Sequence, residues 1–225
     1  MTLSEISRGV GTSLSTCLNL MTTLVEERAV ERSDKSKRYR LAPGWNEFAA
    51  LTSDASRDIA GRAQALLDIF AAESDAAAGL WKVTSRDRVQ LLVHAAKGGG
   101  MRLSLEDGQR QPLGSGAVGR ALAAAECIDE KEMRRRYAAV RWQADLTFDT
   151  YQSQIGLARD LGYAVDRDTA YRGICSIAVP IIDAAPGLCL SASIFSGSRN
   201  DREIASLGAA LVSLRASLLV PSRKG

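Results

Sequence analysis

Two sets of polar side chains near the start of the chain have the residue types and the spacing that contact with nucleic acid requires. The first set is uncharged and lies on one face of a predicted helix: Thr12, Ser13, Ser15, Thr16 and Asn19. The second set is basic and lies in a predicted β-hairpin: Lys35, Lys37, Arg38 and Arg40. Hydroxyl and amide groups on a helix can reach base edges in the major groove, and lysine and arginine can contact phosphate. The two sets therefore indicate a candidate surface for double-stranded DNA.

Local patterns predict the elements that would hold these side chains. Apolar residues recur at helical spacing and leave the uncharged set on the outer face; they are Leu14, Cys17, Leu18, Met21, Leu24 and Val25. Ser13 can cap this helix, and Gly9 and Gly11 allow a sharp turn after a short first helix. The segments 30–32 and 38–41 flank a polar tip and predict a hairpin. This is the outline of a winged helix-turn-helix, although an ordinary helical hairpin with solvated charges fits the spacing equally well.

Length and composition favour a soluble protein with two domains. The chain has 225 residues, of which 46% are hydrophobic and 24% charged, close to the averages of globular proteins. Its formal net charge of +3 is mild, so any affinity for nucleic acid must come from local clusters. No apolar run could cross a bilayer and no signal pattern opens the sequence, so we expect a cytoplasmic protein without membrane contact.

The sequence contains no recognisable catalytic or metal-binding constellation. The cysteines are scattered and form no Cys-x-x-Cys pair, and none lies near the single histidine, His94: Cys17, Cys127, Cys175 and Cys189. We expect free thiols, no metal site and no cofactor. A nucleotide-dependent enzyme or a cysteine hydrolase is the least supported class, because a nucleophile elbow, paired carboxylates and a Cys/His/Asn set are all missing.

The remainder of the chain mixes helical and strand patterns. A helical stretch runs over 45–72 with a polar break at 52–56. Strands are predicted at 79–83, 89–95, 101–105, 163–166, 173–183 and 188–195, and helices at 129–137, 150–161 and from Asn200 onward. Glu203, three residues after Asn200, completes a capping-box pattern.

The segment from Gly114 to Gly119 fits Gly-x-Gly-x-x-Gly at the head of a helix, a pattern typical of dinucleotide-binding turns. Its context argues against that function, because Pro112 and the polar residues 109–111 stand where a buried parallel strand should end. The start of a helix with unpaired N–H groups is instead a natural receptor for a carboxylate.

Several stretches together resemble the IclR family of bacterial transcription regulators. In the first half they are Leu3-Ser-Glu-Ile-Ser, Gly11-Thr-Ser-Leu-Ser-Thr, Leu24-Val-Glu-Glu-Arg-Ala-Val-Glu-Arg and Arg38-Tyr-Arg-Leu-Ala-Pro. In the second half they are Gly162-Tyr-Ala-Val-Asp, Gly173-Ile-Cys-Ser-Ile-Ala-Val-Pro-Ile and Ser196-Gly197, in matching succession. The segment 113–121 also resembles a pocket-lining stretch of the family, with Arg120 in place of a lysine.

The resemblance implies an α+β protein with a winged helix-turn-helix at 1–44, a linker helix at 45–56 and an effector-binding domain of GAF or profilin-like type at 57–225. That domain would have an antiparallel sheet with flanking helices. A homodimer or homotetramer would bind operator DNA and respond to a small-molecule effector, such as a small organic or aromatic acid. When the family's pocket positions are carried over one by one to this sequence, the resemblance implies an effector site made of Leu103, Ala117, Val118, Asp166, Ile174, Ser176, Ile194 and Ser196.

Two departures from the family pattern keep an alternative open. The family has a helix before the position of Leu3, where this sequence begins, so we expect residues 3–41 to lack part of their apolar cover and to be marginally stable. Leu14 and Asn19 stand where the family commonly has lysine and arginine. The alternative is therefore a ligand-sensing protein in which DNA binding is weakened or lost.

Overall fold

The computed structural model describes residues 1–26, 29–33, 36–41, 54–96, 103, 106, 108–181 and 187–219. The chain divides into two compact units, Met1–Ala55 and Ser56–Gly225. Among the described residues, no helix combines the length and the apolar character that crossing a membrane would need.

The N-terminal unit consists of two helices followed by a two-stranded hairpin. Helices α1 (Leu3–Val10) and α2 (Leu14–Glu26) precede strands β1 (Val30–Arg32) and β2 (Tyr39–Leu41), which pair antiparallel. Thr2 caps α1 through a capping box with Glu5, and Gly11, at φ 68°, ends it. The Ser13 hydroxyl accepts a hydrogen bond from the Thr16 N–H at 3.1 Å, so the predicted cap of α2 is present.

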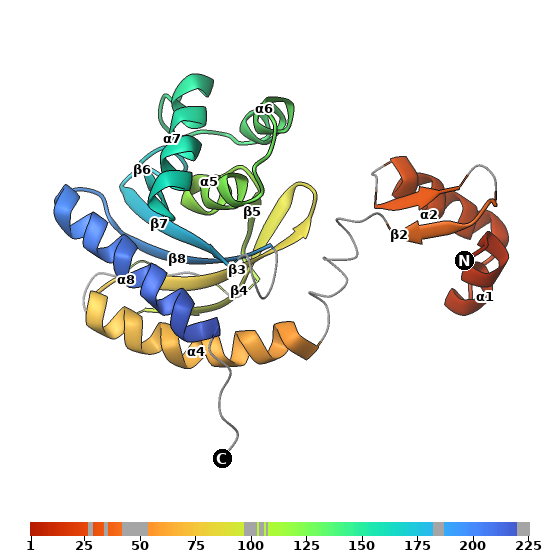
Figure 1. The fold of residues 1–225 in the computed structure, drawn as a ribbon, viewed down its shortest axis with the longest axis horizontal. Coiled ribbons are helices and arrows are strands. Elements are labelled where there is room, and N and C mark those ends of the chain that lie inside the picture. Colours follow the sequence, from red (N-terminus) through yellow and green to blue (C-terminus); the bar gives the residue numbers. More distant parts are fainter. Residues whose placement is uncertain are drawn as a thin grey trace, which may run out of the picture. The chain divides into compact units, whose positions relative to one another are not determined.

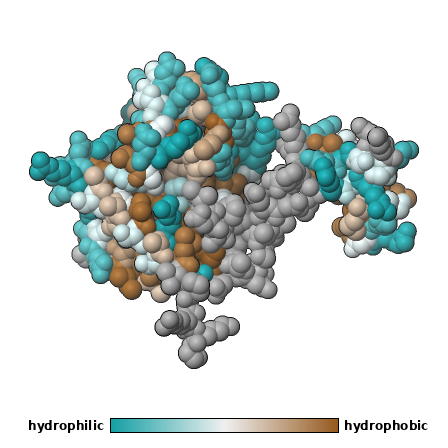
Figure 2. Space-filling view, in the orientation of Figure 1, coloured by the Kyte–Doolittle hydropathy of each residue, from teal (hydrophilic) through white to brown (hydrophobic). Residues whose placement is uncertain are grey.

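The core of the N-terminal unit is small. It consists of Cys17, Met21, Val30 and Tyr39, with Leu3, Ile6 and Val25 packed against them. Four leucines of α2 are exposed, of which Leu14 is 54% exposed; the others are Leu18, Leu20 and Leu24. On the face of the N-terminal unit that Figure 2 shows, brown hydrophobic residues interrupt a mostly hydrophilic surface. Three members of the predicted α2 stripe, Leu14, Leu18 and Leu24, therefore lie at the surface.

The C-terminal unit is built on a six-stranded antiparallel sheet in the order β5-β4-β3-β8-β7-β6. Its strands are β3 (Ala77–Ser85), β4 (Arg88–Ala95), β5 (Arg110–Pro112), β6 (Ala164–Arg167), β7 (Ile174–Ile181) and β8 (Leu188–Phe195). Figure 1 shows α4 (Asp54–Ser74) and α8 (Asp201–Leu219) on one face, and α5 (Gly116–Ala125), α6 (Glu130–Ala138) and α7 (Phe148–Leu161) on the other. The α+β class and the antiparallel sheet with flanking helices are as predicted.

Some predicted elements differ from the structure or lie outside its described part. The sequence predicted no strand just before Gly114, but Arg110–Pro112 forms β5, because it pairs antiparallel with the edge of β4. The third predicted strand, 101–105, lies outside the described residues except for Leu103, and most of the predicted linker helix, 45–53, does too. The helix capped by Asn200 is present, with mutual hydrogen bonds between Asn200 and Glu203.

Candidate functional site

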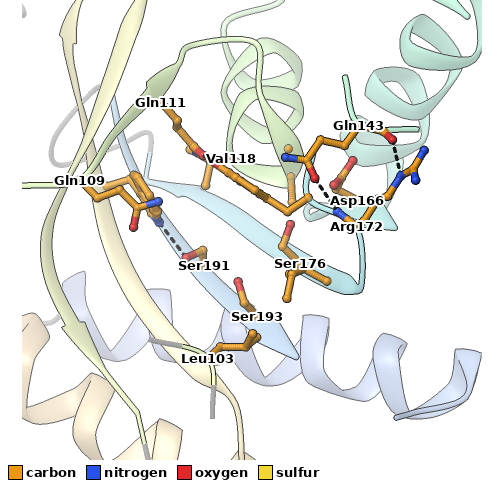
Figure 3. Close-up of a pocket in the computed structure, with 15 residues that line it drawn as sticks. Leu103, Gln109, Gln111, Val118, Gln143, Asp166, Arg172, Ser176, Ser191 and Ser193 are labelled. Atoms are coloured by element: carbon orange, nitrogen blue, oxygen red, sulfur yellow. Dashed lines mark hydrogen bonds between the residues drawn. The ribbon is translucent and has the colours of Figure 1, made fainter. Parts of the chain in front are cut away.

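A cavity of about 380 Å³ lies between the start of α5 and the sheet. Figure 3 shows Gln111 and Val118 on one side, the serines of β7 and β8 on the other, and Gln143 with Arg172 at one end. Its lining residues are Trp81, Leu103, Gln109, Gln111, Gly116, Ala117, Val118, Gln143, Asp166, Tyr171, Arg172, Ile174, Ser176, Ser191 and Ser193. Apolar and uncharged polar groups dominate this lining.

Most of the predicted effector residues meet at this cavity, and two do not. Leu103, Ala117, Val118, Asp166, Ile174 and Ser176 line it. Ile194 does not, because alternate residues of a strand face opposite sides of a sheet and Ser191 and Ser193 take the cavity side of β8. Ser196 lies beyond the end of β8, and its hydroxyl donates to the Asp168 carboxylate at 2.8 Å.

The Asp166 carboxylate is buried and fully partnered. Arg120 Nη1 lies 2.9 Å from Asp166 Oδ1, and the Ala170 N–H donates to Oδ2 at 3.1 Å. The Thr169 hydroxyl also donates to this carboxylate. Asp166 is therefore a neutralised part of the cavity wall.

Arg120 connects several walls of the cavity although it does not line the space itself. It is fully buried, and it donates to Gly116 O at 2.8 Å, Gln154 Oε1 at 2.7 Å and Thr169 Oγ1 at 3.0 Å. Its guanidinium carbon also lies 5.4 and 5.3 Å from the ring centres of Trp142 and Tyr151. Burial lowers the pKa of Arg120, and the neighbouring Asp166 carboxylate opposes that shift. Arginine retains its proton across the physiological range, so the ion pair is maintained.

The glycine motif serves close packing instead of nucleotide binding. A Cβ on Gly114 would lie 2.4 Å from the backbone oxygen of Arg136, and a Cβ on Gly119 would lie 2.4 Å from the backbone of Gly114. Gly116 has φ +61°, a conformation that favours glycine. The glycines thus allow α5 to start close to the chain around α6.

The first turn of α5 borders the cavity. Ser115 occupies the N-cap position without a side-chain capping bond, and the first helical residues, 116–118, line the cavity. The first N–H groups of a helix have no partner inside it. This end of the cavity can therefore accept an anionic or carbonyl oxygen.

The polar floor of the cavity was only partly found from the sequence. The strand registers place Ser193, Ser176 and Asp166 side by side across β8, β7 and β6. Sequence reasoning missed Trp81, Gln109, Gln111, Gln143, Tyr171, Arg172, Ser191 and Ser193. The alternation Ser191-x-Ser193 was a usable signal, but its face depends on the pairing register.

The predicted DNA-contacting side chains differ in how available they are. On α2, Ser15, Thr16 and Asn19 are exposed and Thr12 is half-buried, whereas the Ser13 hydroxyl is engaged in capping the helix. In the hairpin, Lys37 and Arg38 are exposed. Arg40 is also exposed, but it pairs with Glu31 at 2.6 Å. Lys35 lies outside the described residues.

The described residues hold no group of three or more His, Cys, Asp or Glu side chains suited to a metal ion. All four cysteines are free thiols, of which three are buried and Cys127 is exposed.

Comparison with known proteins connects the chain to one family. The family model for the bacterial transcriptional regulator IclR C-terminal domain matches residues 52–216. The glycerol operon regulatory protein of Streptomyces coelicolor is 29% identical over 182 residues, which cover 80% of this chain and 71% of that protein.

Solved structures give the same result. An IclR transcriptional regulator from Alicyclobacillus acidocaldarius is 28% identical, with a TM-score of 0.64 and coverage of 96% of this chain and 88% of that one. The IclR protein of Thermotoga maritima shares the fold at 20% identity, with a TM-score of 0.61 and coverage of 97% and 89%.

Proposed function

The chain belongs to the IclR family of bacterial transcriptional regulators, which are not enzymes, and from that premise we propose that it binds operator DNA and that a small-molecule effector in the cavity changes its affinity. The observation that carries the proposal is the 380 Å³ cavity, which lies within the part of the chain that matches the family model. A DNA surface and a separate cavity supply the two sites that allosteric coupling requires.

We assign DNA contact to residues 1–44 as a winged helix-turn-helix. Exposed Thr16 and Asn19 of α2 would meet base edges, and Lys37 and Arg38 of the hairpin would meet phosphate. Lys35 is assigned the same role from the sequence alone. A homodimer or homotetramer would match the two-fold symmetry of operator half-sites.

We assign the effector's acidic group to the start of α5. Residues 116–118, at the start of α5, line the cavity, and so does Arg172, whose Nε donates to Gln143 O at 2.6 Å. The Asp166 carboxylate is neutralised by Arg120 and would not repel an acid. These features support a small organic acid. The names of the Streptomyces relatives refer to a glycerol operon, which suggests that this chain also controls an operon for a small carbon compound.

Fluorescence anisotropy tests the proposal with the full chain and labelled DNA from the region upstream of its own gene. We expect tighter binding to this DNA than to a scrambled duplex, and a change in affinity when a small carboxylate such as glycerate or propionate is added. Equal affinity for both duplexes would contradict operator binding.

The alternative function is ligand sensing with weakened DNA binding. Two features favour this alternative. Leu14 is exposed and stands where the resembling family commonly has a basic residue, and Arg40 is already paired with Glu31. The same experiment separates the two functions, because this alternative predicts ligand binding without sequence-dependent affinity for DNA.

A further inference from the structure

We propose that the effector is a hydroxylated aliphatic acid, and that Ser176, Ser191 and Ser193 recognise its hydroxyl groups. This inference rests on the proposed function, in which the cavity is the effector site. It adds the chemical class of the ligand and the residues that select it.

The first argument is that two serine hydroxyls on the cavity floor are unused. Ser193 and Ser176 are register partners on adjacent strands, and both line the cavity. Within the described part of the chain, neither hydroxyl has a hydrogen-bond partner. Each can both donate and accept, so the pair offers neighbouring sites for hydroxyl groups of a ligand.

The second argument is the orientation of Ser191. The indole N–H of Trp81 donates to Ser191 Oγ at 2.8 Å in a buried contact. Gly79, the register partner of Ser191, lies beside this contact: a Cβ there would lie 3.5 Å from both Ser191 Oγ and Trp81 Nε1, and 2.7 Å from Leu91 Cδ1. With one lone pair occupied by Trp81, the Ser191 hydroxyl hydrogen is available for donation into the cavity.

The third argument excludes an aromatic ring on the floor. A ring placed over Ser176 and Ser193 would remove their hydroxyls from water without supplying partners, and an unpaired buried hydroxyl is costly. A hydroxylated chain supplies those partners. The volume of about 380 Å³ is near the small end of ligand sites, which suits a short polar molecule.

The test compares acids that differ only in hydroxyl groups. Binding of glycerate and propionate, and of gluconate and hexanoate, to the full chain is followed by tryptophan fluorescence, since Trp81 lines the cavity. Each useful hydroxyl should tighten binding by roughly two- to tenfold. Within each pair the hydroxylated acid should therefore bind more tightly. Glycerol, which lacks the acid, should bind more weakly than glycerate, and benzoate should bind more weakly than gluconate.

Serine variants locate the effect. Ser176→Ala and Ser193→Ala should each reduce the preference for gluconate over hexanoate by roughly two- to tenfold, with hexanoate affinity unchanged. Ser213→Ala is the matched control, because Ser213 is an exposed serine on α8 that donates to Ala209 O at 3.1 Å. It should leave the preference unchanged.

The outcomes separate this inference from the proposed function. Equal or tighter binding of hexanoate or benzoate, no binding of either hydroxylated acid up to millimolar concentrations, or an unchanged preference in both serine variants would overturn the inference. Selective binding of hydroxylated acids without any change in DNA affinity would instead contradict the regulatory function and leave hydroxyl recognition intact.

Discussion

The Asp166 carboxylate lies 2.9 Å from the Arg120 guanidinium, and the two side chains are only 2% and 0% exposed. Arg120 is on α5 and Asp166 on β6, so this ion pair joins the helix that opens into the cavity to the edge strand of the sheet. The bonds from Arg120 to Gly116 and Thr169 extend the connection to the start of α5 and to the turn after β6.

Asp166→Asn should destabilise the C-terminal unit, because it leaves the buried Arg120 charge without its counter-ion. Breaking a buried pair costs about 3–5 kcal/mol in free energy of unfolding. The measurement is urea denaturation followed by circular dichroism. Asp201→Asn is the control: it breaks the solvent-exposed pair of Arg167 and Asp201, which should contribute less than about 1 kcal/mol. Similar losses in the two variants would contradict the structural role of the buried pair.

Lys37→Ala and Arg38→Ala should weaken DNA binding to all sequences alike, because the proposed contacts are to phosphate. Each lost contact should reduce the slope of log K against log salt by about 1. Arg40→Ala should have a smaller effect, since Arg40 already pairs with Glu31. Anisotropy titrations at several salt concentrations measure this, with Arg202→Ala, at an exposed position of α8, as the control. A loss confined to one operator would point to base contact.

Acid should destabilise the C-terminal unit through Glu132. Burial raises the pKa of Glu132, but hydrogen bonds from Arg135 and Arg136 outweigh it and lower the pKa from 4.5 to about 2. Because the folded pKa lies below the unfolded one, the stabilisation is present above pH 4.5 and is lost as the pH falls toward 2. Its size is on the order of 2–3 kcal/mol after allowance for solvent screening.

Glu132→Gln should remove that pH dependence and lower the free energy of unfolding at neutral pH. Denaturation between pH 2 and pH 7 compares it with the unchanged protein. Glu130→Gln is the matched control, because Glu130 pairs with Arg134 in a largely exposed position. The same acid sensitivity in Glu132→Gln and the unchanged protein would exclude this carboxylate as the cause.

Gly114→Ala should destabilise the protein, since its Cβ would lie 2.4 Å from the backbone oxygen of Arg136. Overpacking of this kind costs about 1–3 kcal/mol. Gly156→Ala is the contrast: Gly156 lies within α7 with nothing near its Cβ position, and alanine should stabilise that helix by about 0.5–1 kcal/mol. Thermal unfolding measures both, and a stabilising Gly114→Ala would refute the packing role of the glycine motif.

Amide hydrogens of α2 should exchange faster than those of β7 and β8. The N-terminal core is small and Leu14, Leu18, Leu20 and Leu24 are exposed, so opening this unit uncovers little additional apolar surface. We expect exchange at least about tenfold faster, measured by mass spectrometry on peptides from the full chain. Protection of residues 3–41 equal to that of the two strands would contradict this expectation.

The sequence by itself determined the local elements of this protein. The helical spacing of Cys17, Met21 and Val25, the cap at Ser13 and the Asn200–Glu203 pair all act between residues close in the chain, so their positions could be predicted. The same holds for the long strands 174–181 and 188–195, which contain Ile, Val, Leu and small residues. The predicted cavity residues were all carried over from the family resemblance, which contains fold information that spacing lacks.

Only the tertiary structure decided which side chains face the cavity and which are already engaged. Ser193 lines the cavity, whereas Ile194 was predicted to do so, because adjacent residues of a strand face opposite sides of the sheet. The pairing of β8 with β3 and β7 fixes which residues face the cavity. Arg120 and Asp166 are forty-six positions apart, and their pairing arises only when α5 packs beside β6. Burial, register and charge pairing depend on contacts between distant segments, whereas the patterns in a single sequence report mainly on neighbours along the chain.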